Sequence, residues 1–251
     1  MSSPKIFLMY SPQGGSGKTT LALYTSIKSA LLGKKTLLVD MSAFGSIYSH
    51  LKLNIDQTEG LSDVLSIMKL EQFEGTFEEV IDSSLHETHI QNLRVLISAN
   101  PIKVEGMKES QVLKILDTLS EMNFETIIID TSSELSEKNV VLFERVSKIV
   151  VPVTQDIHCG WRLMQFKEVL NKCGIEDSKV GLVVNRCCKT NAFNNLEYVK
   201  EIGYQVIGEV KEYRRRFQNQ INEGKSLMRI KNRKAIKEFE ETAENILVSA
   251  R

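Results

Sequence analysis

The chain has 251 residues, of which 42% are hydrophobic and 25% are charged. These values are close to the averages of soluble globular proteins and exclude collagen-like, disulfide-scaffold and wholly disordered chains. Thirty-two basic residues balance 32 acidic ones, so the overall charge recruits neither nucleic acid nor membrane, and an electrostatic partner must meet a local patch.

Short apolar runs alternate along the chain with segments of helical period. Runs rich in Ile and Val without strict polar alternation are typical of strands covered on both faces. They predict strands at Lys5–Tyr10, Thr36–Asp40, Leu93–Ser98, Thr126–Asp130, Lys148–Val153, Lys179–Asn185 and Gln205–Val210. Helices are predicted at Lys18–Leu32, Leu61–Ile67, Lys108–Met122, Glu137–Glu144, Trp161–Cys173, Asn194–Ile202 and Lys234–Ser249.

This alternation predicts an α/β fold, a single doubly wound and mostly parallel sheet with helices on both faces. No linker divides the chain, so we expect one nucleotide-binding domain over residues 1–251. The acidic polar face of the last predicted helix has the wrong sign for an anionic bilayer, and we expect it to pack on the sheet.

No apolar run reaches the length of a membrane span, and Ile6–Tyr10 is shorter than a signal-peptide core. The four cysteines lack C-x-x-C spacing, which favours reduced thiols and a cytoplasmic protein. His86 and His89 have no Cys or other His nearby to complete a set of metal ligands.

The most informative segment, Ser-Pro-Gln-Gly-Gly-Ser-Gly-Lys-Thr-Thr at Ser11–Thr20, follows the first predicted strand and opens the first predicted helix. A phosphate-binding loop needs small residues, so that backbone N–H groups converge on an anion, and a helix N-terminus behind them. Gly14, Gly15 and Gly17 supply the first requirement. The segment therefore predicts nucleotide binding.

Two residues at the end of this loop carry side chains suited to phosphate and metal. Lys18 can reach the β- and γ-phosphates, and the Thr19 hydroxyl can bind Mg²⁺. The pattern G-x-x-x-x-G-K-[ST] is not fully met, because its first glycine falls on Pro12. The alternative is a glycine turn whose Lys and Thr merely begin a helix.

Two predicted strands end in a carboxylate, Asp40 and Asp130, and the carboxyl ends of strands border the ligand crevice of an open α/β sheet. Asp130 suits the Walker B role of holding the metal or its water. Asp40 is a candidate catalytic residue near the metal and the attacking water. For each carboxylate the alternative is a helix or turn cap.

These motifs, together with Ile127–Thr131 (I-I-I-D-T) and Val183–Arg186 (V-V-N-R), resemble the ParA/MinD family of deviant-Walker-A ATPases. The resemblance runs over nearly the whole chain, through Val206–Gly208 to Ile221–Gly224. Within the family the chain is most similar to the CpaE/TadZ-like branch of pilus assembly.

The resemblance implies that ATP and Mg²⁺ close two subunits face to face and that hydrolysis reopens them. It implies that Thr20 helps at the α-phosphate and that Asn185 touches the adenine. For Asn185, a polar turn ending a strand is the alternative. The nucleotide-binding set is Gly14, Gly15, Ser16, Gly17, Lys18, Thr19, Thr20 and Asn185, the metal set is Thr19 and Asp130, and the catalytic candidates are Lys18 and Asp40.

Three departures from the family pattern affect the expected mechanism. The position of the signature lysine that reaches across the dimer is occupied by Gln13, and a neutral amide does not stabilise developing charge as a cation does. The position of the second carboxylate is occupied by Ser42, whose hydroxyl cannot act as a general base; a general base contributes roughly 10²–10⁴-fold to the rate. Lys211 replaces a proline that flanks the adenine ring. We expect ATP–Mg²⁺ binding with weak or absent hydrolysis.

The segment Lys211–Lys237 carries ten basic residues against two acidic ones, a net charge of +8. Clustered Lys and Arg can bind phosphate backbones or anionic lipid head groups. The segment therefore predicts non-specific DNA binding, contact with a membrane or acidic protein, or a solvated face paired with the Glu-rich residues 238–244.

Three functions remain open from the sequence. The first is a nucleotide-gated positioning or scaffold protein, recruited by a protein partner to a polar or membrane-associated complex such as pilus or secretion machinery, without inserting into the membrane itself. The second is a cycling ATPase of DNA partitioning or division-site placement. The third, a P-loop kinase or reductase-like enzyme, has little support, because no acceptor-site cluster is recognisable.

Overall fold

The computed structural model describes residues 3–53, 60–70, 74–98, 100–188, 197–213 and 232–250. Within these ranges eight strands form one sheet in the order β3-β4-β2-β5-β1-β6-β7-β8. Every neighbouring pair is parallel except β3 with β4. The strands are β1 (Lys5–Met9), β2 (Thr36–Met41), β3 (His86–Glu87), β4 (Leu93–Leu96), β5 (Thr126–Thr131), β6 (Lys148–Thr154), β7 (Val180–Cys187) and β8 (Gln205–Lys211).

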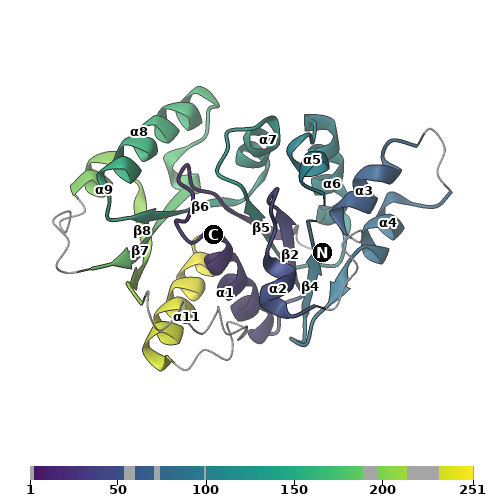
Figure 1. The fold of residues 1–251 in the computed structure, drawn as a ribbon, viewed down its shortest axis with the longest axis horizontal. Coiled ribbons are helices and arrows are strands. Elements are labelled where there is room, and N and C mark those ends of the chain that lie inside the picture. The colour runs from purple at the N-terminus through teal and green to yellow at the C-terminus, as the bar shows by residue number, and fades with distance from the viewer. Residues whose placement is uncertain are drawn as a thin grey trace.

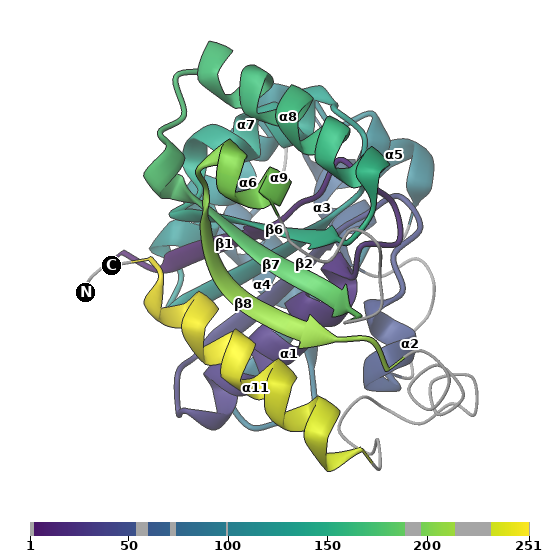
Figure 2. The same cartoon turned by 90° about the vertical axis from the view of Figure 1, so that its left-hand side faces the viewer.

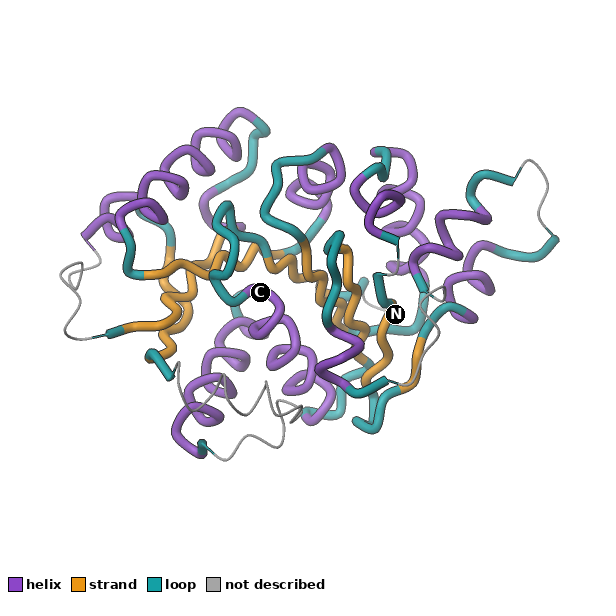
Figure 3. Tube along the Cα trace, in the orientation of Figure 1, coloured by secondary structure: helices purple, strands orange, loops and turns teal. Residues whose placement is uncertain are grey.

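Helices cover both faces of the sheet (Figure 1; Figure 3). In Figure 1, α5 (Pro101–Glu105), α6 (Glu109–Glu121), α7 (Glu137–Arg145) and α8 (Ile157–Lys172) lie above the sheet, whereas α1 (Lys18–Leu31), α2 (Ile47–Leu51) and α11 (Arg233–Val248) lie below it. The remaining helices are α3 (Leu61–Ile67), α4 (Phe77–Ser83), α9 (Glu197–Ile202) and the 3₁₀ turn Asp177–Lys179. None of the helices described is long and apolar enough to cross a bilayer.

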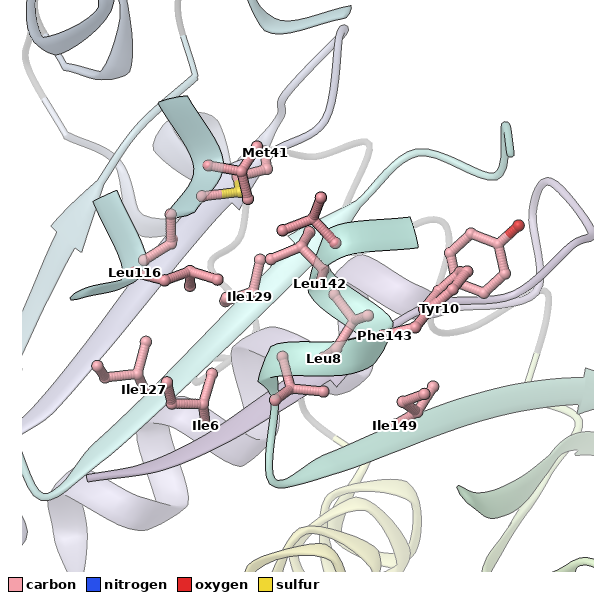
Figure 4. Packing of buried hydrophobic residues seen from close by; sticks show 14 of the residues in the cluster. Ile6, Leu8, Tyr10, Met41, Leu116, Ile127, Ile129, Leu142, Phe143 and Ile149 are labelled. Carbon is pink, nitrogen blue, oxygen red and sulfur yellow. The ribbon is translucent and has the colours of Figure 1, made fainter. Parts of the chain in front are cut away.

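The central strand β1 contributes side chains to the core on both faces of the sheet. Ile6 and Leu8 pack with α6, α7 and α8, while Phe7 and Met9 pack with α1. Figure 4 shows Ile6 and Leu8 beside Ile127, Ile129 and Ile149 of the two neighbouring strands. Because successive side chains of a strand point to opposite faces, a strand covered on both faces needs an unbroken apolar run.

The structure confirms the predicted fold, a mostly parallel doubly wound sheet with helices on both faces. Each predicted strand is present with its ends shifted by at most two residues. Helix α8 begins at Ile157 rather than Trp161, because the Asp156 carboxylate accepts hydrogen bonds from the N–H groups of His158 and Cys159. The first residues of the predicted helix Asn194–Ile202 lie outside the described residues, and α9 is described from Glu197.

Five short elements were not predicted, namely α2, α4, α5, β3 and the 3₁₀ turn Asp177–Lys179. Helix α4 has a complete capping box, in which Thr76 and Glu79 satisfy each other's backbone N–H groups. Helix α5 begins with Asn100 as its cap and Pro101 in its first turn. Caps of this kind are readable from sequence, but short helices show little periodicity, and of the two seven-residue helices α3 and α4 only α3 was predicted.

The last helix, α11, packs on the sheet as predicted, against β8 and alongside α1 (Figure 2). The rings of Tyr24 and Phe239 stack with centroids 4.5 Å apart and an angle of 6° between their planes. An exposed ion pair of 2.7 Å joins Lys28 to Glu244. The helix thus stabilises α1, whose first residue is Lys18.

Candidate phosphate and metal site

The glycine-rich loop joins β1 to α1 at the carboxyl edge of the sheet. Gly15 and Gly17 have φ angles of +70° and +104°, a left-handed conformation that side chains disfavour. Gly17 caps α1, and no side chain accepts a hydrogen bond from the first turn. The N–H groups of that turn are therefore directed at the loop, as in anion sites at helix N-termini.

The Lys18 ammonium extends from this turn toward the segment that follows β5. Its Nζ donates a 2.5 Å hydrogen bond to Oγ of Ser133. Burial lowers the pKa of Lys18, while the charges of Asp130 and Glu134 oppose that shift. A cation that is partly desolvated beside a glycine loop is well placed to meet phosphate oxygens.

Thr19 and Asp130 meet directly, since the Thr19 hydroxyl donates a 2.6 Å hydrogen bond to Oδ2 of Asp130. The other carboxylate oxygen, Oδ1, is buried and has no hydrogen-bond partner. A buried, unpartnered carboxylate oxygen beside a threonine hydroxyl fits Mg²⁺, which is held by one or two carboxylates and keeps several waters. Thr19 and Asp130 would hold that ion, directly or through water.

Asp40 lies beside Asp130 in the β2–β5 register and is 1% exposed. Its carboxylate accepts hydrogen bonds from the N–H groups of Ser42 (3.1 Å) and Ile47 (3.5 Å). A Cβ atom at Gly45 would lie 2.8 Å from Cγ of Asp40, so the turn closes tightly over the carboxylate. Asp40 is thus a turn cap in these contacts, and its catalytic role stays a prediction.

Burial raises the pKa of both neighbouring carboxyl groups, Asp40 and Asp130. For Asp130 the negative charge of Asp40 adds to this effect, and the hydrogen bond from Thr19 and the charge of Lys18 oppose it. A bound cation would favour the ionised form of the pair, because opposite charge lowers the pKa of a carboxyl group.

Asn185, at the end of β7, contacts the phosphate loop itself. Its Nδ2 donates a 2.7 Å hydrogen bond to the backbone oxygen of Ser16, and its Oδ1 accepts one from the Arg186 N–H. A Cβ atom at Gly17 would collide with the Asn185 amide. The described contacts therefore fasten the loop to β7, and the adenine contact of Asn185 stays a prediction.

Gln13 is held within its own chain. Its Nε2 donates to Oδ2 of Asp156 at 3.0 Å, and its Oε1 accepts a 3.3 Å hydrogen bond from the Thr154 hydroxyl. The backbone hydrogen bonds that cap α8 and the one from Gln13 outweigh the effect of burial and lower the pKa of Asp156. A cavity of 280 Å³ opens beside these residues and is also lined by Gly14, Gly15, Arg186 and Glu212.

Sequence reasoning brought together Lys18, Thr19 and Asp130; in the structure Thr19 bonds Asp130, and the Lys18 ammonium is near enough for the charges of Lys18 and Asp130 to interact. Thr20 follows in the same turn of α1, and Ser16 has a buried hydroxyl without a partner. The sequence analysis missed Ser133, which accepts from Lys18, and Asp156, which holds Gln13. Ser133 was recognisable by its place three residues after Asp130, whereas nothing in the sequence links Asp156 to Gln13.

Most of the basic segment lies outside the described residues, including Arg214, Arg215, Arg216, Lys225, Arg229 and Lys231. Of the described members, Lys211 pairs with Glu238 at 3.0 Å and Lys237 pairs with Glu241 at 3.6 Å. Arg233 and Lys234, at the start of α11, are exposed. Two of the ten basic residues thus have the acidic partners that the solvated-face alternative predicts.

A family model described as an AAA domain, AAA_31, matches residues 4–174. An uncharacterized ATP-binding protein of Methanocaldococcus jannaschii is 26% identical over 187 residues, which are 72% of this chain and 64% of that protein. The chain therefore spans less than two thirds of the length of this relative.

Three solved structures share the fold. A plasmid partition protein of Borrelia burgdorferi bound to AMPPNP has a TM-score of 0.76 and 22% identity, with 98% of this chain and 99% of that chain covered. The septum site-determining protein MinD of Pyrococcus horikoshii, complexed with Mg-ADP, has a TM-score of 0.78 and 19% identity, with 97% of this chain and 96% of that chain covered. A ParA family ATPase of Chlorobium tepidum has a TM-score of 0.78 and 17% identity, with 96% of this chain and 99% of that chain covered.

Proposed function

The chain belongs to the AAA_31 family of AAA domains and has the fold of ParA and MinD, and from this premise we propose that it is an ATP- and Mg²⁺-binding switch. In this proposal residues 1–251 form one nucleotide-binding domain. ATP occupancy selects the state that positions or scaffolds a partner, and hydrolysis is weak or absent.

The observation that carries ATP–Mg²⁺ binding is the convergence of Lys18, Thr19 and Asp130 at the end of an uncapped glycine loop. The loop and first turn of α1, from Gly14 to Thr20, would hold the phosphates. The unpartnered oxygen of Asp130 would accept Mg²⁺ or one of its waters. Bound Mg²⁺ would neutralise phosphate charge and so add to the affinity for ATP.

Weak hydrolysis follows from the residues at positions 13 and 42. Gln13 is neutral and is held by Asp156 and Thr154, so it offers no cation to a transferring phosphate. Ser42 carries a hydroxyl where the resemblance implies a carboxylate, and its N–H and carbonyl are engaged by Asp40 and Ser98. A binding switch needs phosphate recognition and differential affinity for two states, but little turnover.

Calorimetry and a phosphate-release assay together test this proposal. We expect ATP–Mg²⁺ to bind the wild-type chain with measurable heat and little phosphate to be released. Absence of heat with adenine nucleotides would contradict nucleotide binding. Brisk turnover that disappears in Lys18→Ala would contradict only the claim of weak hydrolysis.

We further propose that ATP–Mg²⁺ brings two copies of the chain together face to face. The cavity beside Gln13, Gly14 and Gly15 opens at the carboxyl ends of the strands, where a second copy could cover it. Losing a buried cross-subunit charge contact costs on the order of 2–5 kcal/mol, so Gln13 weakens this dimer relative to a lysine. Light scattering with ATP–Mg²⁺, with ADP and without nucleotide measures its mass; a monomer in all three states contradicts dimerisation.

The dimer would recruit a protein partner at the inner face of the cell membrane, and the pilus-assembly role is one form of this proposal. Helix α8 supports a protein contact, because Ile157, Trp161 and Met164 lie on one face and are 53%, 63% and 50% exposed. Asp156 caps this helix and holds Gln13, so the phosphate loop and α8 are in direct contact. Nucleotide state could therefore alter the surface that the partner meets.

The second candidate is a cycling ATPase that binds DNA non-specifically through residues 211–237. The net charge of this segment and the exposed Arg233 and Lys234 favour it. Binding to phosphate backbones weakens steeply with salt and is indifferent to sequence. A gel-shift series at low salt, with and without ATP, tests it, and absence of retardation in both contradicts DNA binding.

A further inference from the structure

Lys138 in α7 is fully buried although it carries an ammonium group. The same helix buries Val141, Leu142 and Phe143, so its core face is otherwise largely apolar. Burial lowers the pKa of Lys138, while the charges of Glu105, Glu134 and Asp40 oppose that shift. A buried charge is costly unless it is paired and hydrogen-bonded, so the partners of Lys138 must offset the cost of burying its ammonium.

The ammonium of Lys138 bonds to two other parts of the fold. Its Nζ donates a 2.7 Å hydrogen bond to the backbone oxygen of Met41, the last residue of β2. It also pairs with Oε1 of Glu105 in α5 at 3.3 Å. The same Glu105 oxygen accepts a 3.0 Å hydrogen bond from the hydroxyl of Ser132.

These contacts join the ends of the two strands that bear the candidate metal-site carboxylates. Met41 directly follows Asp40, and Ser132 lies two residues after Asp130. The next residue, Ser133, is the acceptor of Lys18. The pair of buried Lys138 and half-buried Glu105 therefore connects the end of β2, helix α5 and the segment after β5, which itself contacts the phosphate loop.

Two further hydrogen bonds hold the segment after β5. The Tyr10 hydroxyl donates to the backbone oxygen of Ser133 at 3.2 Å, and Asn139 of α7 donates to that of Glu134 at 2.7 Å. Residues 132–134 are thus fixed from Tyr10, which directly follows β1, and from α1, α5 and α7. Of these anchors, only the Glu105–Lys138 pair also reaches β2.

We propose that Lys138 is a positioning residue of the nucleotide site, which holds the backbone at the end of β2 through Met41 and, with Glu105, the start of the segment after β5 through Ser132. The inference rests on the proposed ATP–Mg²⁺ binding and extends the site to α5 and α7. Lys138 touches neither phosphate nor metal. It acts by holding the backbone beside Asp40 and the segment that presents Ser133 to Lys18.

A purely structural role for this pair is separable from a positioning role. Apolar replacement of a buried ion pair is often neutral or stabilising, whereas removal of one partner alone is strongly destabilising; here Lys138 is fully buried and Glu105 is 34% exposed. The double variant Lys138→Met/Glu105→Leu therefore keeps the core filled while it removes both links to the strand ends. If the pair only stabilises the fold, this variant binds nucleotide as the wild type does.

Lys148 provides a matched control. It is 3% exposed and its Nζ donates a 2.8 Å hydrogen bond to the backbone oxygen of Ser178. It is the first residue of β6 and so lies at the amino ends of the parallel strands, whereas the phosphate loop lies at their carboxyl ends. Lys148→Met therefore removes a buried lysine without touching the nucleotide site.

The experiment measures ATP affinity by calorimetry, with Mg²⁺ and with chelator, beside thermal unfolding. We expect the double variant to unfold near the wild-type temperature and to bind ATP–Mg²⁺ at least 10-fold more weakly, with a smaller loss in chelator. Lys148→Met should fold and keep its affinity within twofold.

Unchanged affinity of the double variant, or an equal loss in Lys148→Met, overturns the inference. Should the double variant not fold, Glu105→Gln replaces it, since it keeps the side-chain shape and removes the charge that holds Lys138. A loss of affinity that depends on Mg²⁺ again supports positioning, and wild-type affinity contradicts it. Failure of the wild-type chain to bind ATP overturns instead the proposed function.

Discussion

The side-chain amide of Gln13 donates a hydrogen bond of 3.0 Å to the carboxylate of Asp156, the residue that caps α8. Its amide oxygen accepts a second one from Thr154. The Gln13 side chain, at the start of the glycine loop, thus points into its own subunit. It can act on a phosphate only after its hydrogen bonds to Asp156 and Thr154 are broken.

Gln13→Lys tests whether a missing cation limits turnover. A lysine at this position can stabilise the charge that develops on the transferring phosphate, and single donors of this kind contribute roughly 10²–10³-fold. Because Ser42 still lacks a carboxylate, we expect a smaller gain, about 10-fold in steady-state phosphate release. Gln13→Ala is the control and should not gain. Equal rates for wild type and Gln13→Lys would show that position 13 is not the limiting defect.

Lys18→Ala should abolish stabilisation by ATP–Mg²⁺. A ligand at 100 times its Kd stabilises the folded chain by about 2.7 kcal/mol. For a chain of this length that corresponds to a rise of roughly 5–10 °C in Tm. We expect this rise in the wild type and in Lys35→Ala, whose lysine precedes β2 at the opposite edge of the sheet, and no rise in Lys18→Ala. A full rise of Tm in Lys18→Ala would show that the Lys18 ammonium does not contribute to phosphate binding.

The sequence sufficed for the sheet and the phosphate loop because both are encoded locally. Strands such as Ile127–Ile129 are buried on both faces and appear as unbroken apolar runs. The loop is recognisable from glycines and Lys-Thr within one segment of ten residues. The fold class therefore followed from alternation alone.

The supporting contacts of the site could not be predicted in this way. The Asn185–Ser16 bond spans 169 positions and the Glu105–Lys138 pair spans 33, and neither residue type announces its partner. A buried lysine is also the opposite of what an amphipathic pattern suggests. These pairings are set by how α5, α7 and β7 pack, which depends on the whole sheet.

Phe239→Ala tests how much α11 contributes to stability. The substitution removes the ring stacked on Tyr24 and leaves a cavity between α1 and α11. Truncation of a buried phenylalanine costs about 3–5 kcal/mol in the free energy of unfolding. Urea unfolding measures this loss. Glu244→Ala removes only the exposed pair with Lys28, which is worth about 1 kcal/mol or less; equal losses in the two variants would contradict the packing of α11.

Asn185 offers a choice between two roles that predict different ligand dependence. If its amide positions the loop through the Ser16 carbonyl, Asn185→Ala weakens every polyphosphate ligand alike. Loss of a buried hydrogen-bond partner costs about 1–3 kcal/mol, so we expect roughly 10-fold weaker binding of both ATP and tripolyphosphate, which has no base.

Asn185→Asp sharpens the test because it keeps the size and places a carboxylate oxygen against the Ser16 carbonyl. Two acceptors cannot share a hydrogen bond, and the charge would be buried, since Asn185 is 5% exposed. We therefore expect a larger loss than in Asn185→Ala, again with both ligands. If Asn185 instead reads adenine, tripolyphosphate binds both variants as it binds the wild type, and only the preference of ATP over GTP falls. Calorimetry with ATP, GTP and tripolyphosphate distinguishes these outcomes.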